Sequence, residues 1–389
     1  MDFALSEEDQ MIRDTVEAIA ASEIAPLAPL LDHSFGKEGR EAFLANLKML
    51  AETGLMGLNV PAEYGGSEAG PIAYAVTMEA LGAACAATAL TVSVTNMVAE
   101  VISRTGNEET KQRFLPPICD GSWPAASFCL TEEGAGSDPG SLRMKARRDG
   151  DDYILDGTKI YISSADYAGC YVVWAKSDPQ ARTGKGITCF AVAADTPGIS
   201  LGRLEEKMGQ HGSATREVVF EGVRVPVSQI LGGEHDGFRV AVGELTGGRI
   251  GIGSMALGIG RAALSAAKEH ALNRKQFGNR LADMQGIQWM LADAETEMEA
   301  ARLLILRAAW AKAQGLPFVK EASMAKLYAS EFAQRATYTA LQIHGGAGYI
   351  RDYPLERYAR DARITTIYEG TSEIQRLIIA REVLLRQAA

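Results

Sequence analysis

The chain has 389 residues, enough for two or three packed domains, and its 47% hydrophobic and 23% charged residues are typical of a water-soluble globular protein. Its 39 Lys plus Arg stand against 49 Asp plus Glu, and a net charge of −10 argues against a nucleic-acid binder, which needs a basic face. The five cysteines form no CxxC pair and have no metal-ligand spacing, which predicts reduced thiols and no metal site.

The sequence predicts neither a targeting signal nor a membrane span. The opening segment MDFALSEEDQMIRD lacks an apolar core and is too acidic for a transit peptide. The longest low-polarity stretch, Ile250 to Ala267, is interrupted by Ser254, Arg261 and Ser265 and is short for a bilayer. We therefore expect a cytoplasmic protein, or a protein of the mitochondrial matrix if the chain is a processed eukaryotic form.

Residues 1–122 predict an N-terminal helical domain. Ser6 and Asp9 resemble a capping box, and apolar residues follow at helical spacing. Pro61, Gly65-Gly66 and Pro116-Pro117 are expected to separate the later helices. Those helices are expected near 41–53, 71–84, 90–104 and 108–115.

Residues 123–230 change to short β-rich runs, with turns such as Asp149-Gly150 and Asp156-Gly157 between them. The expected strands cover 125–130, 142–148, 153–155, 170–175, 187–192 and 217–220. Many short strands without intervening helices predict a middle antiparallel β-domain, either a barrel or a sandwich.

Residues 231–389 return to a helical pattern in long segments, with breaks at Gly278, Gly315-Leu316-Pro317 and Gly345-Gly346. The expected helices cover 238–273, 280–314, 318–344 and 372–387. Four long helices predict a C-terminal bundle, which makes the fold class α+β with several domains.

Several familiar active-site motifs are missing from the sequence. It contains no HExxH, Walker A or GxSxG motif, and its five histidines have no ligand spacing. The run Gly134-Ala135-Gly136-Ser137 is not GxGxxG and follows no strand–helix pattern, which argues against a Rossmann site. A dinucleotide would have to be held in another way.

Four segments in a fixed order carry a family resemblance. They are Phe128-Cys-Leu-Thr-Glu-Glu-Gly-Ala-Gly-Ser-Asp138, Arg274-Lys-Gln-Phe-Gly278, Gln342-Ile-His-Gly-Gly346 and Ile367-Tyr-Glu-Gly-Thr-Ser-Glu373. With helices before, strands between and helices after, the chain resembles the acyl-CoA dehydrogenase family over nearly its whole length. The resemblance implies FAD as the cofactor, an acyl-CoA substrate, an electron-transfer flavoprotein as partner and a homotetramer, with no nucleic acid and no membrane.

The first of these segments is suited to binding a ligand by its backbone. Glycines let the main chain come close to a ligand, and successive N–H groups can cradle a pyrophosphate or the polar edge of a flavin. A solvated turn is the competing interpretation, since Gly, Ser and Asp form turns. The resemblance places Thr131 near the pyrimidine side of the flavin and Ser137 near the pyrophosphate or CoA. It adds Phe128, Leu130 and Gly136 as cofactor contacts.

Tyr161 and Ser163 come at the end of a predicted β-hairpin, where residues two apart share a face of the strand. An ordinary cross-strand pair is the alternative interpretation. The family has Trp and Thr at these positions, flanking the flavin. The resemblance therefore implies a cofactor contact in which the stacking differs.

A second group of residues is assigned to FAD by the resemblance. Arg274 and Phe277 match residues that reach the FAD of a neighbouring subunit, as does the segment with Gln342, Gly345 and Gly346. Arg274 is also explained as a charge that complements a helix C-terminus. The further cofactor contacts are Gln285, Thr371 and Glu373.

Glu369 is the candidate catalytic base. It follows the apolar run Ile-Thr-Thr-Ile-Tyr, and such surroundings remove hydration, raise the pKa of a carboxyl and suit it to proton abstraction. In the family the matching Glu takes the α-proton while the β-hydrogen leaves as hydride to the flavin. The thioester oxygen accepts hydrogen bonds from the backbone N–H of this Glu and from a flavin hydroxyl. Some relatives carry the base at the position of Gly248, which leaves Glu369 as the candidate.

The substrate contacts follow from the same resemblance. Arg249 matches a residue that lines the acyl-CoA path, and a helix-surface cation is the alternative. Thr246 replaces an Asp of many relatives, as in some branched-chain members. Ser137, Tyr368 and Gly370 are the other substrate contacts.

The resemblance is greatest to short-chain or short branched-chain members, which serve fatty acid or branched-chain amino acid catabolism. It implies FAD-dependent conversion of a short linear or branched acyl-CoA to trans-2-enoyl-CoA. An acyl-CoA oxidase-like enzyme and a non-catalytic flavoprotein on the same scaffold are the alternatives.

Overall fold

The computed structural model describes residues 4–33 and 36–385. The described N-terminal helices are α1 (Glu7–Ile19), α2 (Ala28–His33), α3 (Lys37–Glu52), α4 (Gly70–Ala84), α5 (Ala86–Thr105) and α6 (Glu108–Cys119). Ser6 caps α1 by accepting a hydrogen bond from the Asp9 N–H at 3.1 Å. The break expected at Pro116-Pro117 is wrong. Both prolines lie within α6, whose last turn closes with the Asp120 N–H donating to the Pro116 carbonyl.

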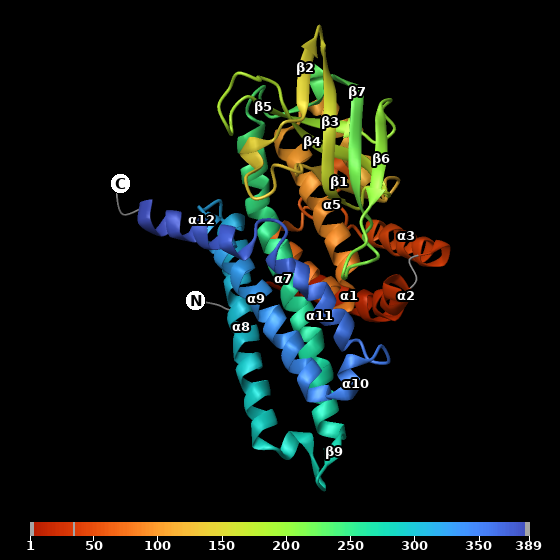
Figure 1. The fold of residues 1–389 in the computed structure, drawn as a ribbon, viewed down its shortest axis with the longest axis vertical. Coiled ribbons are helices and arrows are strands. Elements are labelled where there is room, and N and C mark those ends of the chain that lie inside the picture. The colour runs from red at the N-terminus through yellow and green to blue at the C-terminus, as the bar shows by residue number, and fades with distance from the viewer. Residues whose placement is uncertain (1–3, 34–35, 386–389) are drawn as a thin grey trace.

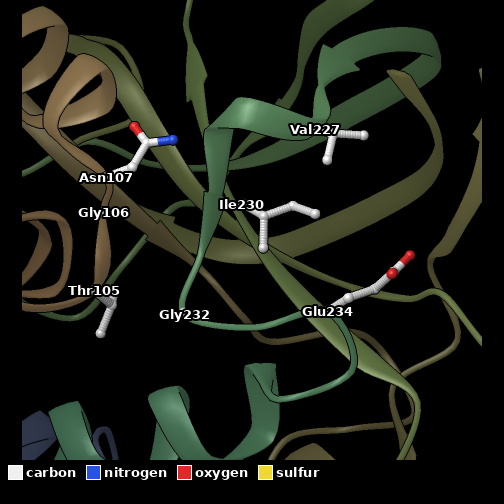
Figure 2. Close-up of a pocket in the computed structure, with 7 residues that line it drawn as sticks. All are labelled: Thr105, Gly106, Asn107, Val227, Ile230, Gly232 and Glu234. Carbon is white, nitrogen blue, oxygen red and sulfur yellow. The ribbon is translucent and has the colours of Figure 1, made fainter. Parts of the chain in front are cut away.

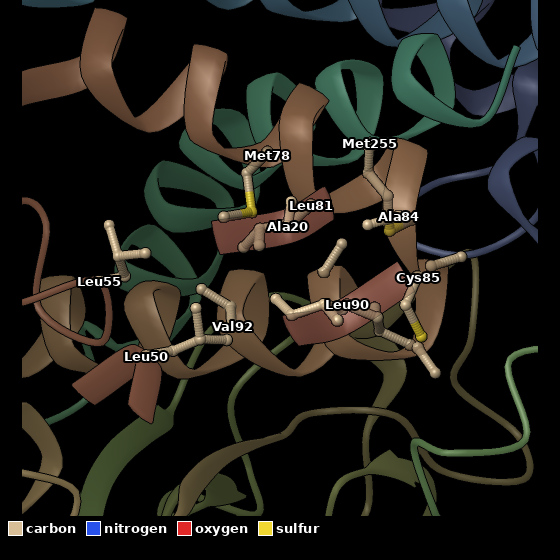
Figure 3. Packing of buried hydrophobic residues seen from close by; sticks show 14 of the residues in the cluster. Ala20, Leu50, Leu55, Met78, Leu81, Ala84, Cys85, Leu90, Val92 and Met255 are labelled. Atoms are coloured by element: carbon tan, nitrogen blue, oxygen red, sulfur yellow. The ribbon is translucent and has the colours of Figure 1, made fainter. Parts of the chain in front are cut away.

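The core of the N-terminal region is built around α4 and α5. Leu81 of α4, Leu90 and Val92 of α5 and Met255 of α7 (Gly237–Asn273) belong to one cluster of buried apolar residues (Figure 3). By length and apolar composition alone, α5 and α7 could each cross a membrane. However, 94% and 78% of their most apolar windows are buried inside the fold. Their apolar character is therefore accounted for by packing against other helices.

The middle of the chain folds into one sheet, which is joined at one end to the long helices (Figure 1). Its strands are β1 (Ala125–Cys129), β2 (Lys145–Asp149), β3 (Asp152–Ser163), β4 (Ala168–Lys176), β5 (Ile187–Ala193), β6 (Ile199–Leu204), β7 (Thr215–Pro226) and β8 (Ile230–Leu231). They follow the order β6-β7-β3-β2-β4-β5-β8, with β1 on β4. Most pairs are antiparallel as expected, but β1 and β2 each run parallel to β4.

The C-terminal region consists of long helices that pack side by side along much of the molecule (Figure 1). After α7 come β9 (Lys275–Gln276), β10 (Asn279–Arg280), α8 (Gln285–Ala313), α9 (Val319–His344), α10 (Gly346–Tyr349), α11 (Leu355–Arg363) and α12 (Ser372–Leu385). α7 packs on α9 and on α4, so this bundle shares its core with the N-terminal helices. The helix expected at 280–314 begins later, at Gln285, because the β9–β10 hairpin precedes it. Residues 386–387 of the last expected helix lie outside the described residues.

Candidate active site

Glu369 lies in a strained turn between the short helix Ile364–Thr366 and α12. Its φ is 51°, and that of Gly370 is 92°, so two consecutive residues take the left-handed conformation. For a residue with a side chain this conformation costs roughly 1–2 kcal/mol. Such strain persists where the surrounding structure holds it, and it is frequent at functional sites.

The Glu369 carboxylate faces α5 and α7. A Cβ built on Gly248 of α7 would lie 2.6 Å from Glu369 Oε2 and 2.6 Å from Met97 Cε of α5. A residue larger than glycine at 248 would therefore occupy the space of the carboxylate. Glu369 Oε2 is buried and has no hydrogen-bond partner within 4–33 and 36–385. A buried acceptor without a partner is unfavourable by about 1–3 kcal/mol, so this oxygen is suited to meet a ligand.

The surroundings of Glu369 adjust its basicity. Burial raises the pKa of the Glu369 carboxyl to about 7, against the opposite effects of Lys326 and Arg249. A base with a pKa near the working pH is efficient in proton transfer. Arg249 is 5% exposed and its Nη1 donates to Ser323 Oγ at 3.4 Å, so the helix-surface interpretation of this cation is wrong. Burial lowers the pKa of Arg249 to about 10.

The other predicted substrate residues differ in their surroundings. Tyr368 is half-buried, and its hydroxyl accepts a hydrogen bond from Gln210 Nε2 at 3.4 Å. Thr246 is 2% exposed, and its hydroxyl donates to the Val242 carbonyl at 2.9 Å within α7. The hydroxyl of Thr246 is thus satisfied by its own helix. Ser137 is exposed on the β-domain loop.

Hydrogen bonds bring the predicted cofactor residues of the β-domain together. The Ile160 N–H donates to the Thr131 carbonyl at 3.0 Å, and Ser127 Oγ donates to the Ser163 carbonyl at 2.7 Å. Tyr161 is 62% exposed with a φ of 57°, beside an irregularity in the β3–β7 pairing. Its ring is therefore available to a ligand. Because the strand is irregular here, regular alternation of side chains does not place Tyr161 and Ser163 on one face, as the sequence had suggested.

The loop from Phe128 to Asp138 fits a ligand that is bound by backbone. Cβ atoms built on Gly134 and Gly136 would meet no described heavy atom within 4 Å, so the main chain there is open. Leu130 is buried, whereas the half-buried Phe128 packs on Trp174 with ring centroids 4.3 Å apart. These features suit the polar edge and pyrophosphate of FAD, as the sequence predicted.

A buried ion pair that the sequence did not reveal shapes the same loop. Lys159 is fully buried, and its Nζ contacts Glu132 Oε1 at 2.7 Å and the Leu130 carbonyl at 3.1 Å. Glu132 also accepts hydrogen bonds from the backbone N–H groups of Arg143 and Met144. The sequence signal that could have pointed to this ion pair was a lysine within a β-rich run. Its partner is 27 residues away in sequence and becomes evident in three dimensions.

The second predicted cofactor group lies elsewhere in the chain. The exposed residues of this group are Arg274, Phe277, Gln285, Gln342, Gly345 and Gly346. They lie at the end of the bundle that carries the β9–β10 hairpin, whereas the β-domain lies at the other end (Figure 1). Within one chain the two groups are not brought together. Thr371 and Glu373 lie instead beside Glu369, where Thr371 Oγ1 accepts a hydrogen bond from the Ile374 N–H at 3.3 Å.

A separate surface pocket of about 410 Å³ lies between the α5–α6 turn and the β7–β8 connection. Figure 2 shows Asn107, Ile230 and Glu234 among the residues that line it. The Glu234 carboxylate already accepts hydrogen bonds from Tyr153 and Arg148. None of the predicted site residues lines this pocket, so it is distinct from the candidate active site.

The order of a helical domain, a β-domain and a second helical domain agrees with a known protein family. The chain belongs to the acyl-CoA dehydrogenase family: it matches the N-terminal domain over residues 6–122, the middle domain over 127–223 and the C-terminal domain over 235–384. It is thus a flavoprotein of the oxidoreductase class, and FAD is its cofactor. The helical, β and helical order predicted from the sequence is confirmed.

Individual relatives are similar over almost their whole length. The chain is 42% identical to an acryloyl-CoA reductase (NADH) of Anaerotignum propionicum, covering 99% of this chain and 97% of the relative. It is 44% identical to the human mitochondrial short-chain specific acyl-CoA dehydrogenase, covering 98% and 91%. Butyryl-CoA dehydrogenase of Megasphaera elsdenii superposes with a TM-score of 0.94 at 38% identity, covering 99% and 100%. A structure described as an electron transferring flavoprotein of Acidaminococcus fermentans superposes with a TM-score of 0.94 at 40% identity, covering 99% and 100%.

Proposed function

We propose that this enzyme converts a short-chain acyl-CoA, linear or branched, to the trans-2-enoyl-CoA, with Glu369 as the base. The observation that carries the proposal is the buried, unpaired Oε2 of Glu369. With a pKa of about 7, this carboxyl is substantially ionised at neutral pH and can take the α-proton. Bound FAD supplies the acceptor for the hydride that leaves the β-carbon.

The backbone of the same residue can assist the reaction. Among the hydrogen bonds of the described residues, the Glu369 N–H donates none, whereas the Ile367 and Tyr368 N–H groups both donate to the Ile364 carbonyl. A free N–H beside the base is suited to the thioester oxygen, where charge develops as the proton leaves. The ionised Glu369 would be balanced by buried Arg249 and Lys326, which limits the cost of holding a charge there.

A buried polar cluster, formed by Glu244 and the Glu100–Lys312 ion pair, favours a short acyl chain. Glu244 of α7 is 4% exposed, and burial raises the pKa of its carboxyl well above the usual range, with Glu100 adding to the effect. Lys312 Nζ contacts Glu100 Oε1 at 2.6 Å. Glu244 precedes Gly248 by four residues, about 6 Å along α7, and Glu100 follows Met97 by nearly one turn of α5. An acyl chain that runs from Glu369 along these helices reaches this polar cluster after about four carbons, and burying apolar carbons against its polar groups is unfavourable.

The proposed partners are an electron-transfer flavoprotein and further copies of this chain. The solved structure described as an electron transferring flavoprotein supports the first. The second is supported by the separation within one chain of the loop carrying Thr131 from the exposed residues Arg274 and Phe277. A homotetramer would let the second group complete the FAD site of a neighbouring subunit.

Reduction of an enoyl-CoA is a second candidate, because one relative is described as an acryloyl-CoA reductase (NADH). The same geometry serves both directions, since Glu369 in its protonated form would return the proton to the α-carbon. NADH oxidation that depends on acryloyl-CoA and exceeds the rate of butyryl-CoA dehydrogenation would favour this direction.

The purified holoenzyme tests the dehydrogenation proposal directly. Under anaerobic conditions, butyryl-CoA or isobutyryl-CoA should bleach the flavin absorbance faster than octanoyl-CoA and dodecanoyl-CoA. Glu369→Gln should retain FAD and lose bleaching by about a thousandfold or more. Equal bleaching by the twelve-carbon substrate would contradict the short-chain assignment, and bleaching by Glu369→Gln at the wild-type rate would contradict the base. Stoichiometric peroxide release in air would point to an oxidase.

A further inference from the structure

Two fully buried side chains converge on the turn that carries Glu369. Lys326 of α9 donates from Nζ to the Gly370 carbonyl at 2.8 Å. Gln375 of α12 donates from Nε2 to the same carbonyl at 2.9 Å and to the Glu369 carbonyl at 3.2 Å. Hydrogen bonds from α9 and α12 together therefore fix the carbonyls of both left-handed residues, Glu369 and Gly370.

Neither side chain is explained by apolar packing. Burying an ammonium group is unfavourable, and Gln375 Oε1 is buried without a hydrogen-bond partner in the described part of the chain. A Cβ built on Gly370 would lie 2.6 Å from Gln375 Nε2, so this amide fits closely against the backbone. An apolar residue of similar size would fill either position without these costs. The hydrogen bonds to the turn are the feature that an apolar residue would lose.

We propose that Lys326 and Gln375 are positioning residues, a clamp that holds the Glu369–Gly370 turn in its left-handed conformation. The clamp directs the Glu369 carboxylate into the space that Gly248 leaves open. The inference rests on the proposed role of Glu369 as the base. Neither clamp residue has to touch the substrate, since both act through the backbone of the turn.

Lys326 also acts on Glu369 through its charge. The charged groups that face Lys326 are Glu369, Arg249 of α7, Glu331 of α9 and Glu373 of α12. Burial lowers the pKa of Lys326 to about 8, with Glu369 acting in the opposite direction. The lysine is therefore a cation at neutral pH and favours the ionised form of Glu369. Its removal leaves Arg249 as the nearby cation and should raise the pKa of the base.

The test compares Lys326→Met and Gln375→Met holoenzymes with the wild type in anaerobic single-turnover flavin reduction across the pH range. Both variants should lose about 10- to 100-fold in limiting rate, with substrate affinity changed by less than about threefold. The acid limb of the Lys326→Met profile should move up by about one pH unit, and Lys326→Arg should restore its position. Lys320→Met, a more exposed lysine of the same helix, serves as the control and should match the wild type.

Stability measurements separate positioning from folding. Gln375→Met removes a buried unpaired oxygen but also two hydrogen bonds to the turn, and the two effects oppose each other, so its denaturation midpoint should stay close to that of the wild type although its rate falls. Wild-type rates and pH profiles in both Met variants would overturn the clamp, provided that Glu369→Gln is inactive. If Lys326→Met fails to fold, the rate and midpoint of Gln375→Met decide the question. An active Glu369→Gln enzyme would instead refute the proposed base.

Discussion

Replacing Gly248 with alanine is the most local perturbation of the proposed base. The new Cβ would lie 2.6 Å from Glu369 Oε2 and 2.7 Å from Met97 Sδ, so the carboxylate must retreat by roughly 0.8 Å to reach an ordinary contact of 3.4 Å. A displacement of this size at a reacting group reduces the rate by about 100-fold. Overpacking costs about 1–3 kcal/mol of stability, and the better helix propensity of alanine offsets about 1 kcal/mol of it. The enzyme should therefore remain folded and keep FAD.

The assay is stopped-flow bleaching of the flavin by butyryl-CoA, together with urea denaturation. Gly243→Ala in the same helix is the matched control, because its Cβ would meet no described heavy atom within 4 Å. It should keep the wild-type rate and gain about 0.5–1 kcal/mol of stability. Bleaching by Gly248→Ala at the wild-type rate would show that the carboxylate does not occupy the space above this glycine.

Further predictions concern pH, the flavin loop and chain length. Flavin reduction should rise with pH through about 7, where Glu369 ionises. Because this pKa lies above the unfolded value of 4.5, the stabilisation is complete below pH 4.5 and is lost as pH rises through 7, by up to about 3 kcal/mol. Glu369→Gln should therefore be more stable than wild type in urea at pH 8 but not at pH 4.5; equal differences at both pH values would contradict this. Lys159→Met, which leaves buried Glu132 without its cation, should cost about 3–5 kcal/mol in urea denaturation, and a cost equal to that of exposed Lys145→Met would count against the loop assignment. Glu244→Ala should raise the octanoyl-CoA rate relative to butyryl-CoA by about tenfold, and an unchanged ratio would remove the polar cluster as the limit on chain length.

Local patterns were sufficient to predict the domain order and most helices. The period of the apolar residues and the glycine breaks placed α7 and α9 within a residue or two of their observed ends. β6 was missed because its sequence, ISLGRL, has a glycine and an arginine where a strand signal needs β-branched residues. The parallel pairing of β1 with β4 was also missed, since pairing between segments more than 40 residues apart leaves no local trace.

In the candidate site too, the residue with a local sequence signal was predicted, whereas the residues that act through tertiary contacts were missed. Glu369 stood out through its apolar neighbours, and the burial of its Oε2, which has no partner among the described residues, agrees with that pattern. Lys326 and Gln375 did not stand out, because a lysine or glutamine in an amphipathic helix is ordinarily solvated. Their hydrogen bonds to the turn form only because tertiary packing brings α9 and α12 against it. The sequence showed that Gly248 stands where some relatives carry the catalytic base. The structure adds that the missing side chain of Gly248 makes room for Glu369.

Exchange of the substrate α-proton with solvent tests the central claim most directly. The anaerobic holoenzyme is incubated with butyryl-CoA in D₂O, and the mass of the recovered acyl group is measured. If Glu369 takes the α-proton, the wild type should introduce deuterium at the α-carbon, and Glu369→Gln with FAD bound should introduce none above the enzyme-free rate. Deuterium incorporation by Glu369→Gln at the wild-type rate would show that another group moves the proton, and it would contradict the account given for this site.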